Sequence, residues 1–285
     1  MPSVGRCHAS VAGATLLAAL GTLLAPGCSL GTGSGYARGT LDVPDCWSGD
    51  FDLRPDFFAA VPSASTALQI RIQNGGDFES FSDGIAFLVD DVGKVRGDPL
   101  SNGTVRPSLL GQTLVVALSP SVRPAGVPVS PVAHPAIVHA SLYLQRTCRT
   151  QNVALYAMDA VTLNADGSCE RPDGGEPPDP CGEPAIVPAP GGDASAAPVA
   201  DASGESGAPL ERIGQSTIVF RSMFDANPAE ANAKQRLTDA DFELYFADPR
   251  EICPGGLGPP PRCRAYLKGS FKFYFERGRP AQPFP

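Results

Sequence analysis

The stretch ALQIRIQN at residues 67–74 carries the pattern that decides the fold class. Leu68, Ile70 and Ile72 alternate with three polar residues, and a period of two is typical of a β-strand with one buried face. The segments DFELYF at 241–246 and GSFKFYFER at 269–277 repeat this alternation with phenylalanine at most of the apolar positions. Further strands are expected at 40–43, 50–53, 85–90, 113–118, 137–146, 153–163 and 217–224.

Clusters of turn-forming residues separate these strands, at 75–77, 91–93, 101–103 and 164–167. Many short strands punctuated by Gly, Pro, Asn and Asp predict an all-β fold, as an antiparallel β-sandwich or a barrel-like domain. One short helix is expected from Asn227 to about Arg236. Asn227 is a typical N-cap residue, and Pro228 and Glu230 follow it in a capping-box arrangement.

Residues 1–27 have the layout of a signal peptide. One fixed positive charge, Arg6, precedes the apolar run VAGATLLAALGTLLA at 11–25. This run is about fifteen residues long, which is short for a membrane-spanning helix, because such a helix needs roughly 20. The sequence therefore predicts export of the chain.

The export segment ends in LAPGC, residues Leu24–Cys28, with the small residue Gly27 directly before the cysteine. This segment resembles the lipobox of bacterial lipoproteins. The resemblance implies that Cys28 is lipidated and becomes the first residue of the mature protein. With Ser29 after the cysteine, the chain resembles lipoproteins that are sent to the outer membrane. Those held at the inner membrane have an aspartate at this position. The alternative is ordinary cleavage after Ala25 or Gly27.

Six cysteines remain once Cys7 and Cys28 are set aside from the eight in the chain, and an even number in an exported protein predicts up to three disulfides. Closeness along the chain favours the pairs Cys253–Cys263 and Cys169–Cys181, which leaves Cys46 with Cys148, although fifteen connectivities are possible. Zinc is a competing interpretation, but no CxxC spacing occurs. The disulfide candidates are Cys46, Cys148, Cys169, Cys181, Cys253 and Cys263.

The composition divides the mature chain into three parts. Residues 28–38 are rich in Gly and Ser and are expected to form a flexible spacer, and residues 39–285 a single β domain. Within that domain, residues 170–210 change abruptly to Pro, Gly, Ala, Ser and acid, so they are expected to form a long disordered insertion. The alternative is that 170–210 links two separate domains.

The charge of the chain argues against one class of partner. The formal net charge is −8, and it becomes −9 when residues 1–27 and their single Arg6 are removed. The only lysines are Lys94, Lys234, Lys268 and Lys272. Because nucleic acids are bound largely through clustered Lys and Arg, we do not expect a nucleic-acid partner.

The sequence assigns no catalytic residue. The motifs Gly-x-Ser-x-Gly, His-Glu-x-x-His and the phosphate-binding P-loop do not occur in it. His134 and His139 are five residues apart, so on a strand they would project from opposite faces. Calcium is the one cofactor considered, because carboxylates cluster near expected strand ends. The calcium candidates are Asp83, Asp90, Asp91, Asp239 and Asp241.

These observations predict a lipid-anchored protein of the bacterial outer membrane, on its periplasmic or surface face, with a structural or adhesive role and no enzymatic activity. The membrane, through Cys28, is the expected partner, together with an envelope protein or polysaccharide. One alternative is a secreted module that binds carbohydrate or protein through exposed aromatics among Tyr143, Tyr245 and Tyr274. The other is a hydrolase that depends on carboxylates or calcium.

Overall fold

The computed structural model describes residues 33–62, 66–75, 82–124, 137–149, 153–164, 166–169, 212–223, 237–253 and 258–274. Strands β1 to β5 are Gly33–Val43, Trp47–Leu53, Phe57–Pro62, Leu68–Asn74 and Asp83–Val89, and helix α1 is Val92–Arg96. Strands β6 to β10 are Leu114–Val115, Val138–Leu144, Ala154–Ala157, Val161–Leu163 and Arg212–Gly214. The last elements are β11 Thr217–Ser222, β12 Leu237–Ala247, the 3-10 turn η2 Pro249–Glu251 and β13 Ala265–Tyr274.

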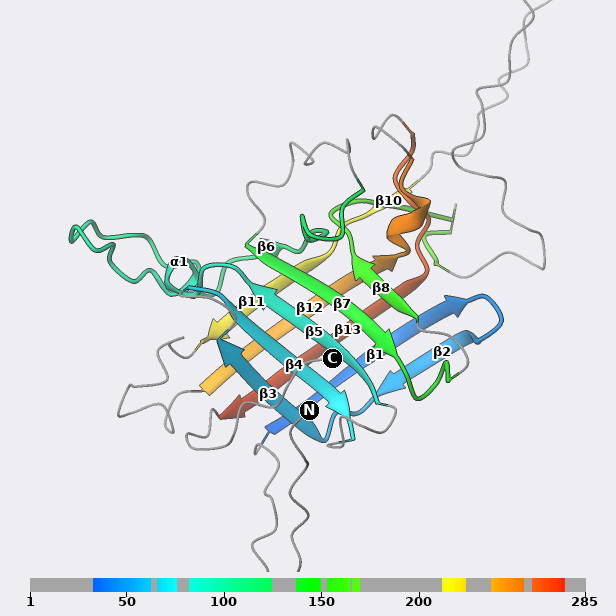
Figure 1. Ribbon diagram of the computed structural model, residues 1–285, viewed down its shortest axis with the longest axis horizontal. Coiled ribbons are helices and arrows are strands. Elements are labelled where there is room, and N and C mark those ends of the chain that lie inside the picture. Colours follow the sequence, from blue (N-terminus) through cyan, green and yellow to red (C-terminus); the bar gives the residue numbers. More distant parts are fainter. Residues whose placement is uncertain are drawn as a thin grey trace, which may run out of the picture.

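The described part of the chain forms an antiparallel β-sandwich, as the alternating pattern predicts. One sheet of 11 strands runs β2-β1-β13-β12-β8-β7-β5-β4-β3, and β11 and β6 extend it from β12. The sheet is folded into two layers, with β3, β4, β5 and β7 in front of β11, β12, β13 and β1 (Figure 1). The layers join where Phe246 and Ala247 of β12 pair with β8.

Phenylalanines fill the space between the layers. The Phe87 ring of β5 lies 5.4 Å from that of Phe242 on β12 and 5.3 Å from that of Phe271 on β13. The Phe58 ring of β3 stacks on Phe273 of β13 at 5.8 Å. Burial of such side chains contributes roughly 1.5–3 kcal/mol each, so this row of rings holds the two layers together.

The glycine-rich segment before residue 39 is not a spacer over its whole length, which corrects the expectation for residues 28–38. Residues 33–38 belong to β1 and pair with β13, from Gly33 opposite Phe273 onward. A Cβ atom at Gly33 would lie 2.7 Å from the Cβ of Phe273 and 2.7 Å from the Phe58 ring. Glycine stands here because two phenylalanines occupy the space above the strand.

Helix α1 occupies a segment that the sequence pattern presents as a turn at 91–93. Asp91 is its N-cap and accepts a hydrogen bond from the backbone of Lys94 at 2.8 Å, while Gly97 closes the helix in the left-handed conformation at φ 79°. The helix expected at 227–236 lies outside the described residues, and so do the segment 170–210, Cys28 and His134.

Two disulfides are described, and one of them has the expected partners. Cys46–Cys148 joins the β1–β2 turn to the segment after β7, with Cα atoms 5.4 Å apart. The other is Cys169–Cys263, at 5.0 Å, so the expected pairs Cys169–Cys181 and Cys253–Cys263 are wrong. The backbone of Cys263 donates to the carbonyl of Thr162 on β9, which brings it beside Cys169. Nearness along the chain does not determine such pairs.

Candidate functional site

The acidic residues named from the sequence are held by protein groups at separate places. Asp83 accepts hydrogen bonds from the backbone of Arg146 at 2.9 Å and from the backbone and hydroxyl of Thr147 at 3.0 and 2.6 Å. It therefore fixes the turn after β7. The carboxylate of Asp90 lies 3.1 Å from Nε2 of the buried His139, whose Nδ1 faces the carbonyl of Ala117 at 2.8 Å.

The other three acids form a helix cap and ion pairs. Asp91 caps α1 and pairs with Arg106 at 2.9 Å. Asp239 and Asp241 both pair with the guanidinium of Arg221, the first at 3.6 Å. Among the residues that the structure describes, no three His, Cys, Asp or Glu side chains are grouped so that they could hold a metal ion.

The three tyrosines considered for a binding face do not form one patch. Tyr143 donates a hydrogen bond to Gln73 at 2.8 Å, and burial raises the pKa of its hydroxyl well above the ordinary value. Tyr245 packs on Tyr266 with ring centroids 4.9 Å apart. Tyr274 is exposed, but it faces Leu237 at the opposite end of the β12–β13 ladder from Tyr245.

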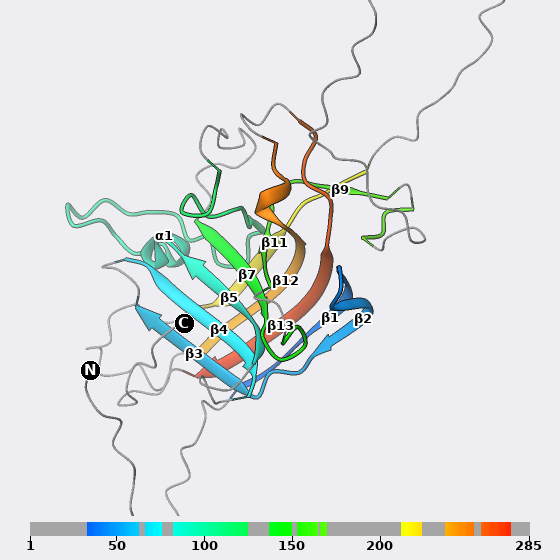
Figure 2. The ribbon, with the colours of Figure 1, turned by 45° about the vertical axis from the view of Figure 1, so that its right-hand side comes forward.

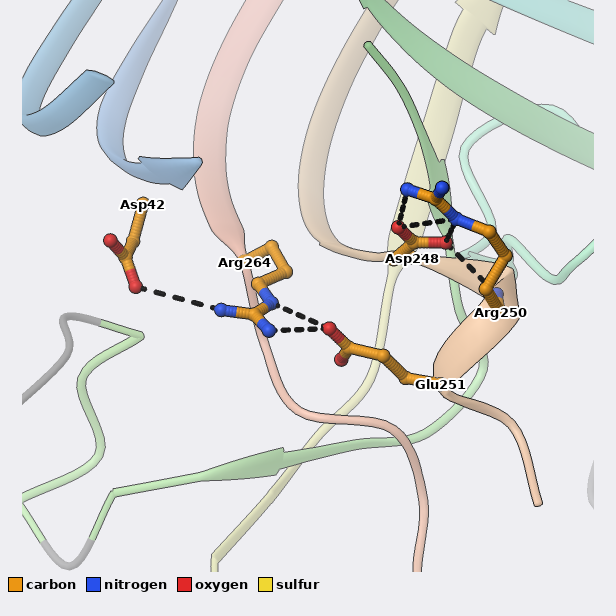
Figure 3. Close-up of polar contacts among 5 residues, drawn as sticks. All are labelled: Asp42, Asp248, Arg250, Glu251 and Arg264. Atoms are coloured by element: carbon orange, nitrogen blue, oxygen red, sulfur yellow. Dashed lines mark hydrogen bonds and ion pairs between the residues drawn. The ribbon is translucent and has the colours of Figure 1, made fainter. Parts of the chain in front are cut away.

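A polar cleft of about 610 Å³ opens where β1 ends and β13 begins. Its walls come from the β1–β2 turn, from β8, from η2 and from the residue before β13, segments that are far apart in the sequence. Six charged residues line it beside Tyr156 and several apolar side chains, and five of them are drawn in Figure 3. They are Asp42, Asp45, Asp248, Arg250, Glu251 and Arg264.

Arg264 forms the buried side of the cleft. It extends between Asp42 on one side and Glu251 on the other (Figure 3). Its Nε and Nη2 both donate to Oε1 of Glu251, at 2.9 and 2.5 Å. Its Nη1 lies 3.8 Å from Oδ2 of Asp42, and within the described residues this buried nitrogen has no hydrogen-bond acceptor. The Arg264 side chain is 10% exposed and that of Asp42 7%, so this ion pair is largely out of water.

A second, more exposed pair lies on η2. Asp248 caps this turn, accepting from the backbone of Arg250 at 2.9 Å, and its carboxylate also binds the Arg250 guanidinium. Burial alone would raise the pKa of Asp248, but the hydrogen bonds from Arg250 outweigh it and hold that pKa below its ordinary value. Asp248 is therefore ionised at neutral pH, and the same bonds raise the pKa of Arg250.

Local chain geometry and disulfides fix the walls. The backbone of Asp42 donates to the carbonyl of Arg264 at 2.7 Å, which ties the end of β1 to the start of β13. The tight turn that follows puts Asp45 at φ 59°, a conformation that Asp and Asn tolerate better than most residues. Cys46 comes next and is bonded to Cys148, while Cys263 directly precedes Arg264 and is bonded to Cys169.

The charges of the cleft restrict what it can bind. Four carboxylates and two guanidiniums give a formal charge of 2 − 4 = −2, so anions are repelled. A ligand suited to these walls donates hydrogen bonds to carboxylates and can also accept from the exposed guanidinium of Arg250. Hydroxyl groups do both. None of these residues stands in a recognisable motif, and the only local sequence signal is the run Asp248–Glu251, which starts with a capping Asp and Pro249.

The fold and the cleft define a disulfide-braced antiparallel β-sandwich with a preformed polar cleft at one end of its long strands. No family model matches the chain, and neither does any curated protein or solved structure. Within the part of the chain that the structure describes, no helix is long and apolar enough to cross a bilayer.

Proposed function

We infer that this protein is a lipid-anchored component of the bacterial outer membrane with an adhesive, non-enzymatic role. Residues 1–27 support export, and the lipobox-like segment Leu24–Cys28 supports attachment through Cys28. The cleft supports an adhesive role, because it offers hydroxyl-bearing molecules, such as an envelope polysaccharide, a preformed site. Its volume of about 610 Å³ is in the range of small-molecule sites.

The observation that carries this proposal is the place of the cleft relative to the attachment point. β1 begins at Gly33, five residues after Cys28, and reaches the cleft at Asp42, nine residues further along. At about 3.4 Å per residue, that length of strand spans roughly 30 Å. A bilayer that holds Cys28 therefore leaves the cleft accessible, and the rigid strand itself acts as the spacer.

A non-enzymatic role agrees with the state of the candidate acids. Asp83, Asp239 and Asp241 are engaged by backbone or guanidinium groups, and Glu251 accepts two hydrogen bonds from Arg264. A general acid or base needs a carboxyl group whose proton can be exchanged with the substrate. Carboxylates fixed by arginine are better suited to hold hydroxyl groups than to transfer protons.

Two measurements test the proposal. Intact mass of the membrane-fraction protein should give a chain that starts at Cys28 and carries acyl mass, and an unmodified chain that starts elsewhere would remove the anchor. Calorimetric titration with neutral oligosaccharides such as maltotriose, cellotriose and chitotriose tests the cleft. We expect binding by at least one of them, and its loss in Asp45→Asn. The matched control is Asp50→Asn on β2, outside the cleft, and equal effects of both variants would contradict the assignment.

A further inference from the structure

The outer face of β1 and β13 carries a second, shallower hollow close to the proposed anchor. It measures about 400 Å³ and lies among β1, β11, β12 and β13. Its polar rim holds hydrogen-bond donors of the kinds that bind phosphate, namely a guanidinium, an ammonium and hydroxyl groups. The polar lining residues are Ser34, Tyr36, Arg221, Asp239, Ser270 and Lys272.

The charge on this face differs from that of the chain as a whole. The outward positions of β1 and β13 hold Arg38, Lys268 and Lys272, and neither strand has an acid along the stretch from Gly33 to Leu41 or from Ala265 to Tyr274. Two of the four lysines in the chain are therefore on one strand. The neighbouring strands supply the balancing acids: Asp239 and Asp241 on β12 pair with Arg221. Asp52 on β2 pairs with Arg38, and Glu243 on β12 lies opposite Lys268. This region is therefore close to neutral in a protein of net charge −8.

Two exposed tyrosines flank the hollow. Tyr36 and Tyr274 are each 43% exposed, and both are among the few large apolar side chains that the described surface leaves open. The register of β1 with β13 places Tyr36 opposite Ser270. Ser270 lies four residues before Tyr274, so these two side chains are on the same face of β13. Tyrosine with neighbouring lysine and arginine is the combination that proteins place at the headgroup level of a membrane.

The length of chain between anchor and strand brings this face to the bilayer. Only residues 29–32 separate Cys28 from Gly33. Even fully extended, the five steps from Cys28 to Gly33 cover at most about 17 Å. The start of β1 and the end of β13, which pair with each other, therefore stay near the lipid, and so do Tyr36 and Lys272.

We propose that the hollow between Tyr36 and Lys272 binds the phosphate of a lipid headgroup in the same leaflet that holds the Cys28 anchor. This inference rests on the proposed function, because the short tether selects the face. Lys272 and the hydroxyls of Ser34 and Ser270 hold the phosphate, while Arg221 stays paired with its two carboxylates and neutralises them. Tyr36 and Tyr274 lie among the headgroups.

The other half of the same face cannot lie on the membrane. Towards the cleft, Gly214 of β10 packs directly on the Tyr245 ring, and Tyr245 and Tyr266 belong to a second apolar cluster outside the sandwich. Figure 2 shows β9 beyond the beginning of β13, on the side of η2. This added layer limits contact with the bilayer to the half of the face near Gly33, so the cleft stays raised from the surface.

The test uses the mature chain, residues 28–285, with Cys28→Ser, so that binding through the face is separated from the anchor. Cosedimentation is measured with phosphatidylcholine vesicles, with and without phosphatidylglycerol, at low and high salt. We expect salt-sensitive binding to the anionic vesicles only. Lys272→Gln should weaken it about fivefold, since a lysine near an anionic surface is worth about 1 kcal/mol. Lys94→Gln on α1 removes the same charge elsewhere and should leave binding unchanged.

The outcomes of these experiments test the headgroup site separately from the Cys28 anchor. Equal weakening by Lys272→Gln and Lys94→Gln would mean that only net charge matters, and it would overturn the headgroup site. Absence of binding to anionic vesicles would overturn it too, as would calorimetric binding of inorganic phosphate without binding to vesicles. The mass of the lipidated protein tests the Cys28 anchor separately, so either proposal can fail without the other.

Discussion

Removal of the Cys46–Cys148 disulfide should destabilise the fold by an amount that the loop length sets. The two cysteines are 102 residues apart in the sequence. In the chain-entropy model, a cross-link that closes a loop of about 100 residues stabilises the folded state by roughly 4.7 kcal/mol at 25 °C. The variant Cys46→Ala with Cys148→Ala should therefore lose about 4–5 kcal/mol of unfolding free energy, a large part of the 5–15 kcal/mol typical of a domain.

Urea unfolding followed by far-ultraviolet circular dichroism measures this loss. The pair Cys169→Ala with Cys263→Ala is the matched control, because its cysteines are 94 residues apart and the two loops do not overlap. The loop of this pair also contains Cys181 and Cys253, which we expect to be bonded to each other, so the pair closes a ring of only about 24 residues and its loss should be smaller, about 3.5 kcal/mol. The two losses should add in the fourfold variant to within about 0.5 kcal/mol if the sites are independent. A loss below about 1 kcal/mol for either pair, with both variants still folded, would refute the argument from loop closure.

Three further predictions concern the cleft and β1. Arg264→Met should cost about 3–5 kcal/mol in urea unfolding, because it leaves buried carboxylates without their cation; a loss under 1 kcal/mol would show that the pair is not out of water. Gly39→Ala should cost about 3 kcal/mol or more, since its Cβ would lie 1.8 Å from a backbone carbonyl oxygen of β13, whereas Thr40→Ala beside it should cost little. Cys253 is disulfide-bonded to a residue outside the described ranges, and Cys181 is the one disulfide candidate left. Peptide mapping without reduction should yield a Cys181–Cys253 peptide, and a free thiol at either residue would contradict this.

The fold class could be predicted because burial and sequence period coincide in the strands. Leu68, Ile70 and Ile72 are fully buried between the layers. The opposite face of β4 departs from the expectation of a solvated surface. Arg71 is 4% exposed, with its guanidinium 5.0 Å above the Tyr143 ring, and burial lowers its pKa. Alternation locates the core face, but it does not show whether the polar face meets water.

The sequence pattern does not identify the start of β1, because glycine has two uses with the same composition. In a spacer it adds backbone freedom, and in a sheet it makes room for a large neighbour. Gly33 and Gly35 lie under the Phe58 ring, and Phe58 belongs to a strand that the sequence pattern does not identify. Only the residues that pack against the glycine show which of the two uses applies. Those residues cannot be identified until the order of the strands in the sheet is known.

The cleft could not be predicted from sequence because its residues become neighbours only through strand order. Asp42 and Arg264 are adjacent because β1 pairs with β13, the last strand in the described sequence. Glu251 reaches Arg264 because β12 ends beside the beginning of β13 and η2 follows directly. Each side chain alone is an ordinary charged residue. The interaction that distinguishes them, a guanidinium largely out of water between two carboxylates, exists only in the assembled sheet.

The position of the disulfides relates the stability of the fold to the cleft. Cys46, Cys253 and Cys263 each lie within two residues of a residue that lines it, so covalent bonds hold three of its wall segments. A wall that is already fixed loses little conformational entropy when a ligand binds, and ordering a flexible side chain or loop costs about 0.5–1.5 kcal/mol for each immobilised group. The layers of the sandwich are held by their phenylalanines in any case. The bonds beside the cleft therefore have a second effect, since they keep Arg264 and its carboxylates in a binding geometry before any ligand arrives.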